Sequence, residues 1–188
     1  MYKSENFQIS LWLVSLMSII LLMIIVGGLT RLTESGLSMV DWRLFMGTIP
    51  PLSHGDWLKV FEDYKQYPEY QIKNINMTLS EFKYIFWWEY GHRVLGRLIG
   101  IIFIIPFIYF ALKKYFSNEE LYSYSFLLFL GGAQGIIGWW MVKSGLDVNP
   151  YVSQLRLAVH LIIAQIILSL IAYLFLKRLD IGIYKNNF

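Results

Sequence analysis

Four long apolar runs restrict the folds open to this chain more than any other feature of its sequence. They cover about residues 9–29, 85–112, 121–142 and 153–176. A helix needs about 20 apolar residues to cross the hydrocarbon core of a membrane, and each run reaches that length. The backbone finds no water inside the hydrocarbon, so each spanning segment must be an α-helix. The sequence therefore predicts an all-α membrane protein, with one domain over residues 1–188 that forms a four-helix transmembrane bundle.

Composition agrees with this class and excludes several others. Of the 188 residues, 56% are hydrophobic, whereas soluble domains are typically about 45–50% apolar. The net charge is only +3, and the basic residues form no stripe with interleaved aromatic side chains, so nucleic acid is not an expected partner. The chain has no cysteine, which excludes disulfides, cysteine-bound zinc and iron–sulfur clusters. The first run is too long for a signal peptide and is interpreted as a retained span.

Lysine and arginine residues predict how the bundle is oriented. They occur in both tails and between the second and third runs, at Lys3, Lys113, Lys114, Lys177, Arg178 and Lys185. Cytoplasmic segments carry the excess of these residues, so both termini are expected in the cytoplasm. Residues 30–84 then form a long extracytoplasmic loop.

That outer loop carries its own helical pattern. Trp57, Val60, Phe61 and Tyr64 follow the spacing of an amphipathic helix. Pro50-Pro51 is expected to break the chain before this helix and Pro68 to end it. We expect the helix to lie on the outer membrane surface and to cover the mouth of the bundle.

The second span has features beyond its length. Thr78-Leu79-Ser80-Glu81 has the form of a capping box, which allows the helix to begin before residue 85. Such a helix exceeds the span length, so it must tilt, kink at Pro106 or project from the membrane. There is also a weak internal repeat, because Ser35-Gly36-Leu37 follows the first span and Ser144-Gly145-Leu146 follows the third. The repeat suggests two related helix pairs.

The second span also carries ionisable residues. Glu89, His92 and Arg93 are spaced to share one helix face, and such groups within a membrane usually face a bundle interior and mark a functional site. Glu89 is interpreted either as an acid–base or charge-stabilising group or as a structural partner for Arg93. Arg93 and Arg97 suit bidentate contacts to carboxylates such as haem propionates, or they extend towards the outer interface.

Two histidines lie at similar predicted depth, His92 in the second span and His160 in the fourth. Imidazoles from facing helices can ligate one haem iron from both sides. The alternative is two buried histidines that bond only to backbone or hydroxyl groups. His54 lies in the outer loop and is interpreted as a loop residue without a ligand role.

Glycines are concentrated in the second and third spans, where they allow close helix packing or leave room for a flat macrocycle. They lie at Gly96, Gly100, Gly131, Gly132, Gly135 and Gly138. Gln134 lies in the same stretch and is a candidate polar contact.

Several segments together resemble the haem A synthase family, in order and over nearly the whole chain. The first runs from Gly27-Gly28-Leu29-Thr30-Arg31 through Ser35-Gly36-Leu37-Ser38 to Trp42 and Gly47-Thr48-Ile49-Pro50-Pro51-Leu52. The others are Glu89-Tyr90-Gly91-His92-Arg93 with Gly96-Arg97, Gly131-Gly132-Ala133-Gln134-Gly135 with Gly138-Trp139, and Arg156-Leu157-Ala158-Val159-His160-Leu161. The cysteine-free outer loop resembles the mitochondrial and alphaproteobacterial branch of this family.

The resemblance implies an oxidoreductase that converts the C8 methyl group of haem O to a formyl group, giving haem A for cytochrome oxidase. It implies that His92 and His160 hold the substrate haem through its iron, and that Glu89 supports oxidation at the methyl carbon. Arg93 and Arg97 are the predicted further haem contacts. It implies membrane lipid as surroundings and the bacterial plasma membrane as location, ahead of the mitochondrial inner membrane.

Members of the family have eight spans in two four-helix halves, and the second half holds a haem b cofactor. This sequence carries four spans. The expectations are a truncated gene, a fragment, a split enzyme with a second four-helix half, or a half that pairs with itself as a homo-oligomer. Haem O synthase is a further expected partner.

Two other functions remain open from the residues alone. One is a haem-binding membrane electron carrier, which has no need of a carboxylate one turn from its ligand. The other is a non-catalytic assembly factor for cytochrome oxidase, which would bind no haem.

Overall fold

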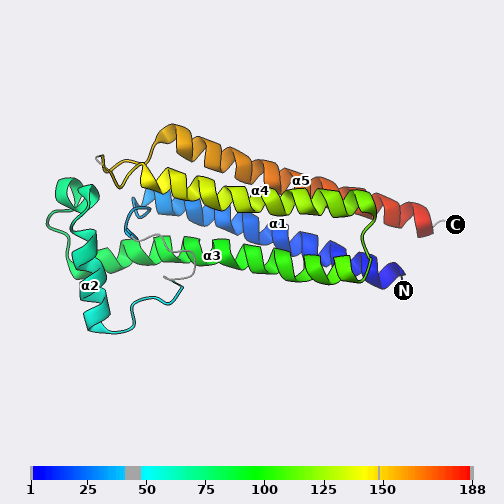
Figure 1. Cartoon of the computed structure of the whole chain (residues 1–188), viewed down its shortest axis with the longest axis horizontal. Coiled ribbons are helices and arrows are strands. Elements are labelled where there is room, and N and C mark those ends of the chain that lie inside the picture. The colour runs from blue at the N-terminus through cyan, green and yellow to red at the C-terminus, as the bar shows by residue number, and fades with distance from the viewer. Residues whose placement is uncertain (1, 41–47, 148, 187–188) are drawn as a thin grey trace.

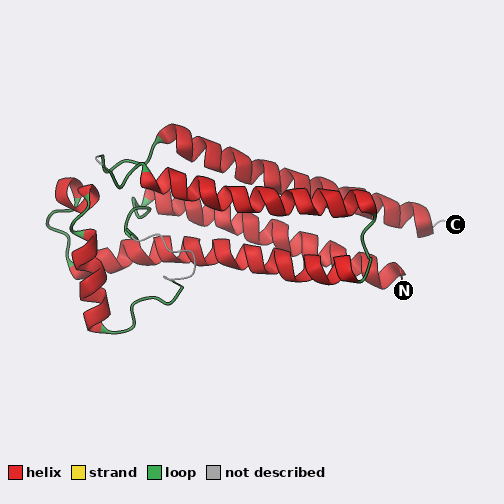
Figure 2. Ribbon diagram, viewed as in Figure 1, coloured by secondary structure: helices red, strands yellow, loops and turns green. Residues whose placement is uncertain are grey.

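The protein is a bundle of long helices with a small helical cap at one end (Figure 1). The computed structural model describes residues 2–40, 48–147 and 149–186. Its elements are α1 (Tyr2–Leu32), α2 (His54–Tyr64), the π-helix η1 (Glu69–Lys73), α3 (Leu79–Leu112), α4 (Asn118–Lys143) and α5 (Gln154–Asn186). These described segments contain helices and no strand (Figure 2). The predicted all-α class is confirmed.

Within the part of the chain that the structure describes, four helices are long and apolar enough to cross a membrane, namely α1, α3, α4 and α5. Each is longer than the apolar run that predicted it, because polar residues extend the helices beyond the hydrocarbon. A capping box starts α3, in which Thr78 accepts a hydrogen bond from Glu81 N and Glu81 accepts one from Thr78 N. With 34 residues, α3 is about 50 Å long and exceeds the hydrocarbon core. It continues through Pro106, and its first turns carry the outer cap.

The helices pack in the order α3, α1, α5, α4. α1 packs along both α3 and α5, and α5 also packs along α4, whereas α3 and α4 share fewer contacts. Both termini lie at one end of the bundle, and the cap lies at the other (Figure 1). Both termini thus lie on the same side of the bundle, as four spans predict. The assignment of that side to the cytoplasm stays a prediction.

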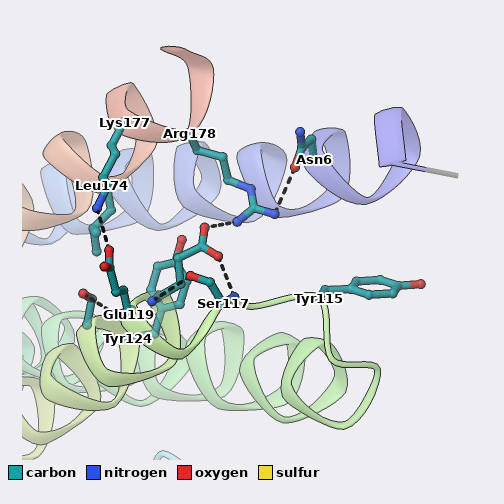
Figure 3. A pocket seen from close by; sticks show the side chains of 10 residues that line it. Asn6, Tyr115, Ser117, Glu119, Tyr124, Leu174, Lys177 and Arg178 are labelled. Atoms are coloured by element: carbon teal, nitrogen blue, oxygen red, sulfur yellow. Dashed lines mark hydrogen bonds and ion pairs between the residues drawn. The ribbon is translucent and has the colours of Figure 1, made fainter. Parts of the chain in front are cut away.

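Three helices are joined by polar side chains at the terminal end. Arg178 of α5 is buried, forms an ion pair with Glu120 of α4 and donates to Asn6 Oδ1 of α1 at 3.0 Å. Lys177 pairs with Glu119 beside them at 3.4 Å. These groups line a cavity of about 300 Å³ (Figure 3). The ion pair at this buried position neutralises the arginine.

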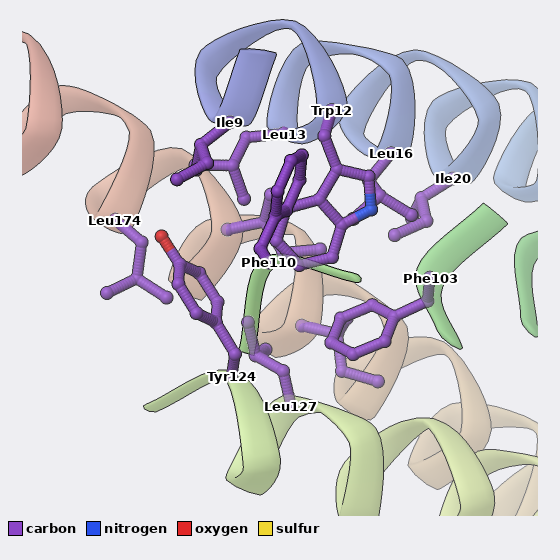
Figure 4. Packing of buried hydrophobic residues seen from close by; sticks show 12 residues of the cluster. Ile9, Trp12, Leu13, Leu16, Ile20, Phe103, Phe110, Tyr124, Leu127 and Leu174 are labelled. Carbon is purple, nitrogen blue, oxygen red and sulfur yellow. The ribbon is translucent and has the colours of Figure 1, made fainter. Parts of the chain in front are cut away.

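An apolar cluster fills the terminal half of the bundle (Figure 4). Trp12 lies at its centre, with Phe103 and Phe110 of α3 and Tyr124 of α4 packed edge-on against its ring. Aromatic rings in this geometry contribute about 0.5–1.5 kcal/mol per pair beyond their buried area.

A second apolar cluster forms the outer cap. Trp57, Phe61 and Tyr64 of α2 are buried against Phe82 and Phe86 of α3. The predicted amphipathic helix is therefore present, and its apolar face packs on the projecting part of α3. α2 ends at Tyr64, and Pro68 precedes η1.

Candidate functional site

Glu89 lies on α3 just beneath the cap, and its carboxylate is fully enclosed by donors. The residue is 3% exposed. Ser38 Oγ and Met39 N each donate to Oε2 at 2.8 Å, and Arg93 Nη2 donates to Oε1 at 2.6 Å. Three donors, one of them a guanidinium, compensate the cost of burying this charge. The carboxylate is thereby held in one orientation.

Arg93 connects the same carboxylate to the segment after α1. Besides its ion pair with Glu89, its Nη2 donates to Met39 O at 2.8 Å. The predicted pairing of Glu89 with Arg93 is confirmed, and it does not exclude a functional role, because the pair lies among other site residues. No local pattern pointed to Ser38 and Met39 as partners, since they lie 51 and 50 positions away along the chain.

His92 packs against α1 at a glycine. A Cβ atom on Gly27 would lie 3.1 Å from His92 Nε2 and 3.4 Å from its Cδ2. Only glycine leaves the ring this position without a shift. A Cβ atom built on the next residue, Gly28, would have no other atom within 4 Å, so the close approach is specific to Gly27.

His160 packs against α4 in the same way. A Cβ atom on Gly138 would lie 3.1 Å from His160 Cε1. Gln134, one turn earlier on α4, donates from Nε2 to the backbone oxygen of His160 at 2.8 Å. This confirms Gln134 as a polar contact. Its Oε1 and the Nδ1 of His160 are buried atoms without a hydrogen-bond partner among the described residues.

The two imidazoles belong to one region of the bundle. They lie between the apolar cluster of the terminal half and the cap, because Gly27 and Gly138 are both close to the outer ends of their helices. His92 of α3 packs against Gly27 of α1, and His160 of α5 packs against Gly138 of α4. The same kind of glycine–histidine contact thus occurs in both helix pairs.

The residues present fit a haem. Two imidazoles suit the two axial positions of a haem iron. Buried polar atoms without partners, Gln134 Oε1 and His160 Nδ1, remain available to a ligand. Several glycines of α3 and α4 have no atom within 4 Å of a Cβ position, which leaves space beside these two sparsely packed helices: Gly91, Gly100, Gly131, Gly132 and Gly135. No group of three or more histidine or acidic side chains that could hold a bare metal ion occurs within the described segments.

Other residues singled out by sequence lie elsewhere. His54 is the exposed first residue of α2, so it begins a helix and the predicted loop position is wrong, while its lack of a ligand role stays a prediction. Arg97 is half-buried on α3, one turn beyond Arg93, and its contact with a propionate stays a prediction. Trp42 and Gly47 lie outside the described residues.

Sequence reasoning missed one buried carboxyl group. Glu69, the first residue of η1, is 3% exposed and accepts a hydrogen bond from Tyr64 OH at 3.0 Å. The loop sequence around it is polar, so neither composition nor periodicity indicated burial there.

A second cavity lies at the outer end, with a volume of about 340 Å³. Met39 and Val40 line one side, and Trp139, Lys143 and Asp147 line the other. Neither this cavity nor the one at the terminal end is lined by the histidines.

Fold and site together define a multi-pass membrane protein with two histidines on helices long and apolar enough to span and a buried acidic group beneath an outer cap. The sequence profile of the COX15-CtaA family, described as cytochrome oxidase assembly protein, matches residues 10–183. The chain belongs to this family.

Curated relatives agree with this assignment. The chain is 51% identical over 158 residues to a protein named heme A synthase from Bradyrhizobium diazoefficiens, covering 84% of this chain and 44% of that one. It is 49% identical over 174 residues to the heme A synthase of Nitrosospira multiformis, covering 93% and 49%. For that of Flavobacterium psychrophilum the identity is 50% over 164 residues, covering 86% and 48%. The chain thus spans about half the length of the curated relatives it matches. No solved structure matches it.

Proposed function

We propose that this chain forms the substrate-binding half of a haem A synthase, an oxidoreductase that converts the C8 methyl group of haem O to a formyl group. The observation that carries the proposal is the pair of imidazoles, each packed against a glycine of a neighbouring helix towards the same end of the bundle. The names of the relatives support the same activity.

In this proposal His92 and His160 would hold the substrate haem through its iron. Bound haem O supplies the reacting methyl group and a ring that can spread positive charge. Arg97 and Arg93 bind the propionates, with Arg93 also held by Glu89. A guanidinium suits this role because it donates two parallel hydrogen bonds to one carboxylate.

Glu89 is proposed to stabilise positive charge that develops on the substrate during oxidation. Its three donors hold the carboxylate in place before the reaction, so no reorganisation is needed when charge appears. The reaction balances as R–CH₃ + H₂O → R–CHO + 4 H⁺ + 4 e⁻, with water as the source of the formyl oxygen.

The electrons require a one-electron acceptor. We infer a b-type haem held by the part of the relatives that this chain does not cover, or by a second copy of the chain. The proposed location is the bacterial inner membrane with both termini in the cytoplasm, and haem O synthase is the proposed supplier of substrate.

Haem binding is tested by absorption spectra of the purified chain reconstituted with haem B or haem O. We expect a spectrum of a haem with two histidine ligands in the wild type, and its loss or change in His92→Ala and in His160→Ala. His54→Ala is the matched control and should keep the wild-type spectrum. Absence of bound haem in the wild type would favour an assembly factor that binds none.

The role of Glu89 in the reaction is tested with the Glu89→Gln variant in cells that make no haem A of their own and supply the remaining half of the enzyme. We expect bound haem to persist and haem A formation to fall at least about a hundredfold, the effect typical of losing one preorganised electrostatic group. Glu62→Gln, on the exposed face of α2, is the control with wild-type haem A. Unchanged haem A in Glu89→Gln would remove Glu89 from the mechanism.

A further inference from the structure

Glu69 is a buried carboxyl group in the outer cap with little to stabilise its charge. Tyr64 OH donates to its Oε2 at 3.0 Å, and Asn74 Nδ2 donates in turn to Tyr64 OH at 2.8 Å. Burial, more than any other cause, raises the pKa of Glu69 to about 7. At neutral pH this side chain can therefore both accept and release a proton.

Glu69 lies next to the Glu89 site. Tyr64 and Met39 belong to the same apolar cluster over α3, and Met39 N is one of the donors to Glu89. The charge of Glu89 acts electrostatically on both Glu69 and Tyr64. The cap thus places a second acidic side chain above the first.

An exposed ion pair lies close to Glu69. Lys73, four positions on in η1, pairs with Glu34 at 2.6 Å, and Glu34 is 57% exposed. Both charges act on Glu69 electrostatically, so three acidic side chains gather at this end of the molecule: Glu89 of α3, Glu69 of η1 and Glu34 after α1. The aromatic side chains of α2 and α3 close the rest of the cap.

We propose that Glu69 accepts protons released at the Glu89 site and passes them to the aqueous phase at the outer end. This inference rests on the proposed function, because oxidation of a methyl group to a formyl group releases four protons along with the four electrons that leave to the one-electron acceptor. Carboxyl groups buried in membrane proteins commonly serve as proton relays.

A purely structural role would not require a carboxyl group. A glutamine at this position would accept the same hydrogen bond from Tyr64 and would cost less to bury. Burying the acidic residue costs more free energy than burying the amide. The property that the acid has and the amide lacks is the ability to take up a proton.

The first arm of the test is a titration of the purified chain, followed by the infrared carbonyl stretch of protonated carboxyl groups. We expect a band that titrates near pH 7, is absent in Glu69→Gln and persists in Glu62→Gln. Glu89→Gln removes a neighbouring negative charge, so it should lower the pKa of Glu69. A Glu69 that titrates in the ordinary range, or is indifferent to Glu89→Gln, would overturn the proposal.

The second arm measures haem A formation against pH in cells or membranes that supply the remaining half. Glu69→Gln should slow formation about tenfold or more and remove the limb of the pH profile near 7, with bound haem unchanged. Glu69→Asp should restore part of the rate, and Glu62→Gln should match the wild type.

The two proposals fail in different ways. If the wild type forms haem A and Glu69→Gln does so at the same rate with the same pH profile, the relay is wrong and the proposed function stands. If the wild type forms no haem A, the proposed function falls and the relay falls with it.

Discussion

At the scale of single residues, two glycines determine how the histidines sit. The glycines of the spans were expected either to allow close helix packing or to leave room for a macrocycle. Gly96 is a packing position, because a Cβ atom there would lie 3.4 Å from Met23 Cε. Gly27 and Gly138 differ because a histidine ring occupies the space a side chain would need. The two roles look alike in a sequence, since both give a small residue on a helix.

Gly27→Ala should therefore weaken haem binding while Gly28→Ala should not. The added methyl group would displace His92 by a few tenths of an ångström, which we expect to cost about 1 kcal/mol, roughly fivefold in affinity. Absorbance titration with haem measures both variants. Equal affinities of Gly27→Ala and Gly28→Ala would show that the contact does not position the ring.

At the scale of elements, a proline and a tryptophan act together. Pro106 has no N–H, so the carbonyl of Ile102 lacks its partner within α3. Trp12 of α1 takes that place, with its indole Nε1 donating to Ile102 O at 2.9 Å. This bond explains how α3 continues through the proline in a medium that offers no water.

Trp12→Phe should destabilise the protein more when Pro106 is present than when it is replaced. With Pro106 the variant leaves a buried carbonyl unsatisfied, at about 1–3 kcal/mol. In the Pro106→Ala background the helix supplies its own N–H, so only the loss of packing remains. Thermal unfolding in detergent of the four proteins of this cycle gives the coupling. Equal costs of Trp12→Phe in both backgrounds would contradict it.

At the scale of the whole molecule, the two helix pairs meet at the outer end through the repeated segments that follow α1 and α4. Leu37 of the first is 3% exposed and packs on Gly145 of the second, where a Cβ atom would lie 2.8 Å from both Leu37 methyl groups and 3.3 Å from Val152 N. The sequence repeat suggested two related pairs, and the structure adds that the repeats contact each other.

Gly145→Ala should consequently lower stability by about 1–3 kcal/mol, the usual cost of overpacking. Gly36→Ala is the matched change in the other repeat, where the nearest atom would lie at 3.8 Å, and it should have little effect. Melting temperatures of both variants measure this. A Gly145→Ala protein as stable as Gly36→Ala would mean that the two segments do not pack tightly.

The class of the protein and the helices that carry its ionisable residues could be predicted from local sequence patterns. Apolar length, helical periodicity and capping boxes depend on neighbours within a few positions, so they indicated four spanning helices, the amphipathic α2, the start of α3 near Thr78 and the placement of Glu89, His92 and His160. What those residues contact became visible in the folded chain alone. Ser38 and Met39 reach Glu89, Gly27 supports His92, and Glu69 is buried in the cap. These contacts join parts of the chain far apart in sequence, and the packing of helices in three dimensions sets them.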